Sequence, residues 1–146
     1  MFKKYIISLS VLLLSTPIFS ASLDIGRDQD SIHMDPILVN QNADVWVLNN
    51  MHSLIVRNNR EATGIEADLA ESWDISADGK TYTFNFRDNL KFNDGTPLKT
   101  SDAKFSIERL RDGEGSVFGS MFNIIDSIDT PDDRTIVFNL KEASTP

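Results

Sequence analysis

The stretch DLAESWDISADGKTYTFNFRDNLKFNDGTP, residues 68–97, decides the fold of this chain. Apolar side chains alternate with polar ones at Trp73 and Ile75, and again over residues 82–86. Successive side chains of a strand point to opposite faces, so this alternation predicts two strands that each bury one face. Residues 77–80, Ala-Asp-Gly-Lys, supply the turn between them, because glycine reaches positive φ without steric strain.

Hydrophobic spacing and turn residues on either side of this hairpin predict further elements. Thr100-Ser101-Asp102 is expected to open a helix with Thr100 as its cap, and Gly113 to follow its end. The overall expectation is an antiparallel sheet with helices on one side. The other predicted elements are helices over 42–53 and 117–122, and strands over 23–27, 54–57, 124–129 and 134–141.

The first residues have the layout of a secretory signal peptide. Lys3 and Lys4 precede a mostly apolar run over residues 5–19, and the small residues 20–22 follow. This run is too short and too interrupted for a transmembrane helix, which needs about 20 apolar residues. We expect residues 1–22 to be the signal peptide, with cleavage after Ser22 or after Ser20. An uncleaved membrane anchor is the competing interpretation.

The chain of 146 residues is acidic and has no cysteine. Its formal net charge is −8, and without the two signal-segment lysines it is about −10. An acidic protein is a poor partner for nucleic acid, so no nucleic acid is expected to bind. Without cysteine the chain can form no disulfide and carries no site for lipid attachment at a cleaved signal. A soluble protein of a bacterial periplasm is therefore expected.

Four blocks of sequence, in order along the chain, carry a family resemblance. The blocks are Met34-Asp35-Pro36, Asp68-Leu-Ala-Glu-Ser-Trp73, Asp78-Gly-Lys-Thr-Tyr-Thr-Phe84 with Arg87, and Lys91-Phe-Asn-Asp-Gly-Thr-Pro97 leading into Asp102-Ala-Lys-Phe-Ser106. Together they resemble the family 5 extracellular solute-binding proteins of ABC importers, which include oligopeptide, dipeptide and nickel binders. The resemblance covers residues 23–146. Three positions depart from the family pattern: Ala67 stands for the usual proline, Asn93 for a frequent histidine and Lys99 for a common capping threonine.

The resemblance implies an α/β fold of the type II periplasmic binding protein kind. Family members are longer and close two lobes on a ligand. Residues 23–146 would form the N-terminal part: the first strand of one lobe and an inserted antiparallel-sheet subdomain. The implied function is that of a periplasmic substrate-binding component that binds peptides and delivers them to ABC permease subunits in the inner membrane. A monomer without cofactor or catalytic activity is expected.

Two segments are candidate ligand contacts by this resemblance. Asp30, Ser31 and Ile32 follow the first predicted strand and would line the cleft, where main-chain groups can pair with an extended peptide. Phe118 would pack on a ligand side chain, and Met121 would offer an adaptable apolar surface. The competing interpretation is that Phe118 and Met121 are core residues of a short helix.

Other residues that could suggest chemistry have simpler interpretations. His33 and His52 lie on different predicted elements with no cysteine to join them, so no metal site is expected. Residues 28–35 contain three aspartates but lack the glycine and distal glutamate of a calcium loop. Residues 94–97, Asp-Gly-Thr-Pro, are interpreted as a structural turn.

Alternative functions stay open from the sequence. The chain could belong to a nickel, haem or other small-solute binder of the same family. It could also be a truncated secreted hydrolase, although it has no nucleophile elbow, phosphate loop or histidine-based triad. A free-standing surface adhesion module is the third alternative. Because nothing after the last predicted strand completes a sheet, a fragment of a longer protein is expected.

Overall fold

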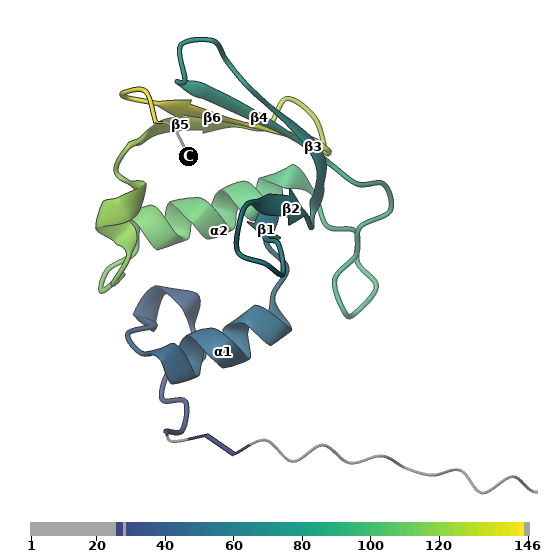
Figure 1. The fold of residues 1–146 in the computed structure, drawn as a ribbon. Helices are drawn as coiled ribbons and strands as arrows, with labels where there is room; N and C mark the ends of the chain where they lie inside the picture. The colour runs from purple at the N-terminus through teal and green to yellow at the C-terminus, as the bar shows by residue number, and fades with distance from the viewer. Residues whose placement is uncertain (1–25, 28, 145–146) are drawn as a thin grey trace, which may run out of the picture.

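The computed structural model describes residues 26, 27 and 29–144, so the predicted signal segment 1–22 lies outside the described residues. Of the strand predicted over 23–27 only Gly26 and Arg27 are described, and neither is in a strand. Figure 1 shows the arrangement of the elements. They are the 3₁₀ helices η1 (Pro36–Leu38) and η2 (Gly119–Phe122), the α-helices α1 (Asn42–Met51) and α2 (Thr100–Asp112), and the strands β1 (Val56–Asn58), β2 (Ile65–Ala67), β3 (Ala70–Ile75), β4 (Thr81–Phe86), β5 (Ile125–Asp129) and β6 (Thr135–Leu140).

The main sheet has four antiparallel strands in the order β3-β4-β6-β5, and β1 with β2 forms a separate two-stranded sheet. The predicted hairpin of β3 and β4 is confirmed, with Trp73 opposite Phe84, and Phe84 opposite Ile136 on β6. Opposed residues project to the same face, so aromatic and aliphatic side chains gather on one side of the sheet. The turn residue Gly79 has φ +67°, as the sequence predicted.

The hydrophobic core lies between this face and α2, which runs beneath the sheet in Figure 1. Phe86 and Ile136 are almost completely buried at its centre. Ala103 and Ile107 of α2 pack against the buried cluster, in agreement with their helical spacing. The rings of Phe84 and Phe138 meet edge to face with centroids 5.7 Å apart. The mixture of helices with an antiparallel sheet agrees with the predicted fold class.

The start of α2 differs from the sequence prediction. Thr100 is buried, and its hydroxyl donates a hydrogen bond of 2.6 Å to the carbonyl of Asp132, so it does not cap the helix. The carboxylate of Asp102 instead accepts a 2.8 Å hydrogen bond from the amide of Lys99, the residue before the helix. The threonine is therefore used to tie α2 to the β5–β6 turn.

The N-terminal elements also differ slightly from their predicted ranges. Helix α1 ends at Met51 rather than at residue 53, because the chain turns extended at His52. The following strand begins at Val56 rather than at residue 54. Leu54 instead donates its amide to the carboxylate of Asp68 at 2.8 Å, which fixes the approach to β1. None of the described helices is long and apolar enough to cross a membrane.

Candidate ligand-binding site

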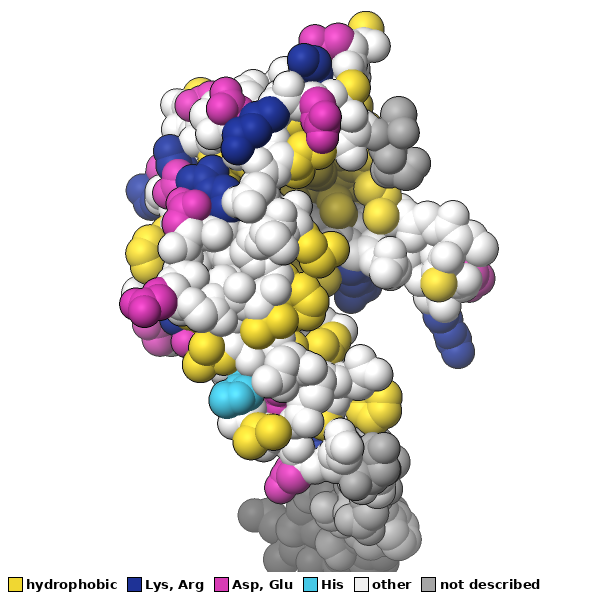
Figure 2. Space-filling model, turned by 90° about the vertical axis from the view of Figure 1, so that its left-hand side faces the viewer, with side chains coloured by type: hydrophobic (Ala, Val, Ile, Leu, Met, Phe, Trp, Pro, Cys, Tyr) yellow, Lys and Arg dark blue, Asp and Glu magenta, His cyan; other side chains and the backbone are white. Residues whose placement is uncertain are grey.

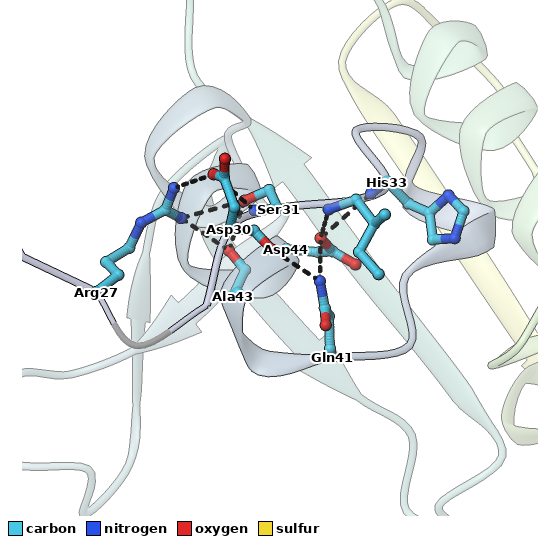
Figure 3. Close-up of polar contacts among 8 residues, drawn as sticks. Arg27, Asp30, Ser31, His33, Gln41, Ala43 and Asp44 are labelled. Carbon is cyan, nitrogen blue, oxygen red and sulfur yellow. Dashed lines mark hydrogen bonds and ion pairs between the residues drawn. The ribbon is translucent and has the colours of Figure 1, made fainter.

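The first candidate segment, Asp30–Ile32, lies across the first turn of α1 and is held there by Asp44. One carboxylate oxygen of Asp44, Oδ1, accepts hydrogen bonds from the amides of Ile32 at 2.8 Å and His33 at 3.2 Å. The same oxygen accepts a third bond of 3.2 Å from the side-chain amide of Gln41 (Figure 3). The carboxylate thus joins the extended segment to the start of the helix.

Asp44 is completely buried, which is unusual for a carboxylate. Burial raises its pKa, but the hydrogen bonds from Gln41, Ile32 and His33 lower it, and the net pKa lies below the usual value. Its second oxygen, Oδ2, has no hydrogen-bond partner among the residues that the structure describes. The carboxylate therefore stays ionised and acts as an acceptor at the base of the segment.

Asp30 and Ser31 are part of the same network, whereas Ile32 projects outward. The guanidinium of Arg27 lies 3.1 Å from the carboxylate of Asp30 and donates a 3.1 Å hydrogen bond to the hydroxyl of Ser31. That hydroxyl donates to the carbonyl of Ala43 at 3.0 Å. The side chain of Ile32 is 68% exposed. Ser31 is therefore engaged within the protein, and Ile32 and the carboxylate of Asp30 face solvent.

The next feature along the chain is an ion pair that links η1 to α2. Arg109 donates two hydrogen bonds to Asp35, from Nη1 to Oδ1 at 2.7 Å and from Nη2 to Oδ2 at 2.6 Å. These bonds lower the pKa of Asp35 to about 2. Asp35 also accepts the amide of Ile37 at 3.3 Å, which caps η1. The aspartate of the Met34-Asp35-Pro36 block thus has a structural partner 74 residues away.

The main chain and small residues extend this link to the loop after α2. The amide of Val117 donates a 3.0 Å hydrogen bond to the carbonyl of Ile37. At Gly115 an added Cβ would lie 3.7 Å from a methyl group of Leu38. We call these contacts, together with the Asp35–Arg109 pair, the joint. The joint brings η1 against the loop that leads to Phe118.

Phe118 and Met121 lie on either side of a close contact between η2 and the end of α2. The intervening Gly119 is buried, and a Cβ added there would lie 2.8 Å from the carbonyl oxygen of Arg111. No side chain fits at that distance, so glycine lets the backbone of η2 approach the helix. The amide of Met121 donates to the carbonyl of Phe118 at 2.9 Å, which closes this turn.

Both of these residues face outward. Phe118 is 37% exposed and Met121 is 70% exposed, so the interpretation of Met121 as a core residue of a short helix is wrong and Phe118 is only partly covered. Leu38 and Val117 next to them are exposed as well. Figure 2 shows hydrophobic side chains gathered over the middle and lower part of the molecule near a histidine, while charged side chains cluster above. The loop thus contributes to an exposed apolar surface.

The structure brings the two candidate segments together only indirectly. Among the described residues, no hydrogen bond joins Asp30–Ile32 to Phe118 or Met121. The two segments are related through the joint, which connects the chain after Ile32 to the chain before Phe118. Two hollows of about 770 and 270 Å³ lie elsewhere. The first is lined by Asn85 and residues 132–135, and the second by Tyr82, Phe84, Ile125, Phe138, Leu140 and Ser144.

The remaining polar candidates that the structure describes make structural hydrogen bonds. The carboxylate of Asp94 accepts the amide and the hydroxyl of Thr96, at 2.9 and 2.7 Å, which supports the interpretation of residues 94–97 as a turn. His33 donates its amide to Asp44. Within the described part of the chain, no group of three or more histidine, aspartate or glutamate side chains is placed to hold a metal ion.

Sequence reasoning missed the residues that position the site. Asp44 has the sequence context of an ordinary acid in the first turn of a helix, and its burial depends on a segment eleven residues or more before it. Arg109 has the context of a surface residue near a helix end. The one sequence signal for the joint was the Asp35-Pro36 pair, because an aspartate before proline favours a capped turn. Nothing in the sequence indicated that Arg109 would pair with this aspartate.

Comparison with known proteins identifies the family. Residues 64–146 match the family described as bacterial extracellular solute-binding proteins, family 5 middle. The chain belongs to this family. Over 129 residues it is 35% identical to a "Probable D,D-dipeptide-binding periplasmic protein DdpA" of Escherichia coli, an alignment that covers 85% of this chain and 25% of that protein. The family 5 chain described here therefore spans about a quarter of the length of this relative.

Solved structures of family 5 type share the same fold. The ABC transporter-associated periplasmic binding protein DppA of Helicobacter pylori, in complex with the peptide STSA, matches with a TM-score of 0.68 and 31% identity over 80% of this chain and 26% of that chain. The protein NikZ of Campylobacter jejuni, in complex with Ni(L-His), matches with a TM-score of 0.62 and 32% identity over 66% of this chain and 20% of that chain. Both matches support the assignment of this chain to the periplasmic binding protein fold.

Proposed function

We propose that this chain is the N-terminal part of the periplasmic substrate-binding component of an ABC importer, and that the whole protein binds peptides. The observation that carries the proposal is the fold and sequence similarity over 80% of the chain to a structure solved with a bound peptide. Residues 1–22 would direct export, and residues 23–146 would form part of one lobe. The protein would then present its ligand to permease subunits in the inner membrane.

The two candidate segments would make one side of the ligand cleft, with Ile32, Phe118 and Met121 exposed and Ser31 partly buried. We call the set of Asp30, Ser31, Ile32, Phe118 and Met121 the ligand wall. Phe118 and Met121 offer apolar surface that adapts to different side chains, as a binder of varied peptides needs. The carboxylate of Asp30 pairs with Arg27 but is almost fully exposed, so the wall keeps an acceptor that suits a peptide ammonium. The work of such a wall is binding, and no covalent bond changes.

The test uses the protein at the length that its source cell produces, purified from the periplasmic fraction. Isothermal titration with trialanine and with Ser-Thr-Ser-Ala is expected to give saturable binding. Phe118→Ala is expected to weaken it about tenfold or more, because losing a buried aromatic contact costs about 1.5–3 kcal/mol. Phe105→Ala is the matched control, since Phe105 is a 67% exposed phenylalanine on α2. Absence of binding to any di- to tetrapeptide would refute the peptide assignment.

A second candidate is a carrier of a small metal complex or other small solute. The observation that favours it is the similarity to NikZ, which was solved with a nickel–histidine complex. Elemental analysis of protein purified from cells grown without added metal separates the two candidates. Stoichiometric nickel in the purified material would support the second, and a metal-free protein that binds peptides would support the first.

Export can be tested separately. N-terminal sequencing of the periplasmic protein is expected to begin at Leu23, or at Ala21 if the alternative cleavage site is used. An intact Met1 in membrane-bound material would support the competing anchor interpretation. The monomer expectation is checked by light scattering of the same preparation.

A further inference from the structure

We propose that the Asp35–Arg109 pair is a positioning device that sets the two halves of the ligand wall relative to one another, without touching the ligand itself. The role of the pair in ligand binding rests on the proposed function. The spatial relation that the inference describes does not depend on that function. It begins from the observation that the two candidate segments, 86 residues apart between Ile32 and Phe118, have no direct hydrogen bond among the described residues.

The chain path shows why the joint controls their relation. Ile32 lies three residues before Asp35, and its amide is held against α1 by the buried carboxylate of Asp44. Phe118 follows directly after Val117, whose amide is bonded to Ile37. Both halves of the wall therefore reach the joint within three residues. A change in the angle at which η1 meets α2 would move Ile32 relative to Phe118.

The geometry of the pair suits orientation better than stability. The side chains of Arg109 and Asp35 are 40% and 38% exposed, and ion pairs in such positions contribute little to the free energy of folding because water screens them. Two parallel hydrogen bonds between a guanidinium and a carboxylate, however, fix the relative orientation of two planar groups. A single lysine ammonium would hold the distance but not this orientation.

The variants are made at Arg109, because Asp35 also caps η1 and its replacement would alter the turn itself. Arg109→Ala removes both hydrogen bonds to Asp35, and Arg109→Lys keeps the positive charge without the bidentate hydrogen bonding. Lys104→Ala is the matched control, because Lys104 lies on the same helix and its ion pair with Glu108 stays within that helix. Thermal unfolding is measured for each variant to show that it folds.

The decisive readout is the distance between two spin labels. Residues 1–146 contain no cysteine, so Ile32→Cys and Met121→Cys introduce the only labels in this part of the protein, at two exposed positions. Any cysteine elsewhere in the full-length protein is first replaced by serine. Pulsed electron paramagnetic resonance on the full-length protein is expected to give a narrow distance distribution in the parent and in Lys104→Ala. Arg109→Ala is expected to broaden or shift it, with Arg109→Lys in between. An unchanged distribution in Arg109→Ala would overturn the proposal.

Binding of trialanine to unlabelled protein supplies the second readout. We expect Arg109→Ala to weaken it about tenfold, as when only a tenth of the molecules keep the competent arrangement. Lys104→Ala should leave it unchanged. If the parent protein binds no peptide, the proposed function fails, and the label distances still decide whether the pair positions the two segments. A shifted distance with unchanged peptide affinity would refute the role of the pair in binding.

Discussion

Replacing Ile136 with alanine should destabilise the protein by about 3–4 kcal/mol. Ile136 is fully buried on the central strand β6, opposite Phe84 and above α2. The change removes three carbon atoms, and at about 0.8 kcal/mol for each buried methylene the transfer contribution is about 2.4 kcal/mol. The surrounding sheet cannot collapse fully, so a cavity adds to this value and brings it to about 3–4 kcal/mol, inside the usual range for this replacement.

Ile75→Ala is the matched control for this prediction. Ile75 lies on the same face of the sheet, opposite Tyr82, but it is 39% exposed on an outer strand. The same three atoms are already partly in water and leave no closed cavity, so we expect a loss of about 1.5 kcal/mol or less. Urea unfolding followed by tryptophan fluorescence measures both values. The dependence of the free energy of unfolding on urea concentration should be the same in both variants as in the parent. Equal losses in the two variants would refute the assignment of the core to the centre of this sheet.

Three further predictions follow from the turn, the joint and the buried carboxylate. Gly79→Ala should destabilise the chain by about 1–2 kcal/mol in the same assay, because φ is +67° there, and a neutral result would contradict the turn geometry. The pKa of Asp35 is lowered to about 2, so the carboxylate contributes stability above its ordinary pKa, and this contribution is lost as pH falls through about 2. The melting temperature of Arg109→Ala should therefore lie slightly below that of the parent at neutral pH and converge with it in strong acid; a difference that does not change with pH would contradict the ion pair. Asp44→Ala should speed hydrogen exchange at the two backbone amides that donate to Asp44 Oδ1, because alanine removes the acceptor, and unchanged exchange would show that these amides do not depend on the carboxylate.

The hairpin and α2 were predictable because their information is local. Strict alternation in residues 82–86 sets the buried face, and Gly79 sets the turn, so β3, β4 and their pairing follow from a short stretch. Strands β5 and β6 were predicted for the same reason. The end of α1 and the start of β1 were misplaced by two residues. Helix α1 ends where the backbone becomes extended at His52, and the approach to β1 depends on Asp68, whose carboxylate accepts the amide of Leu54 fourteen residues away.

The site was less predictable because its contacts are distant in sequence. The sequence indicated Phe118 and Met121 by resemblance, and their exposure agrees with a role on a surface. It gave no sign that Thr100 would be drawn into the β5–β6 turn, or that Asp44 would be buried under Ile32 and His33. Such polar groups leave no periodic pattern, since their roles come from where the chain returns in space.

The two outer strands of the sheet, β3 and β5, both carry acids on exposed positions. Glu71 and Asp74 lie on the first, and Asp126 and Asp129 on the second. Two copies that approached each other edge to edge would bring these carboxylates together. Their repulsion opposes the edge-strand pairing by which open sheets aggregate. The acidic side chains of the two outer strands are thereby expected to protect this chain from self-association.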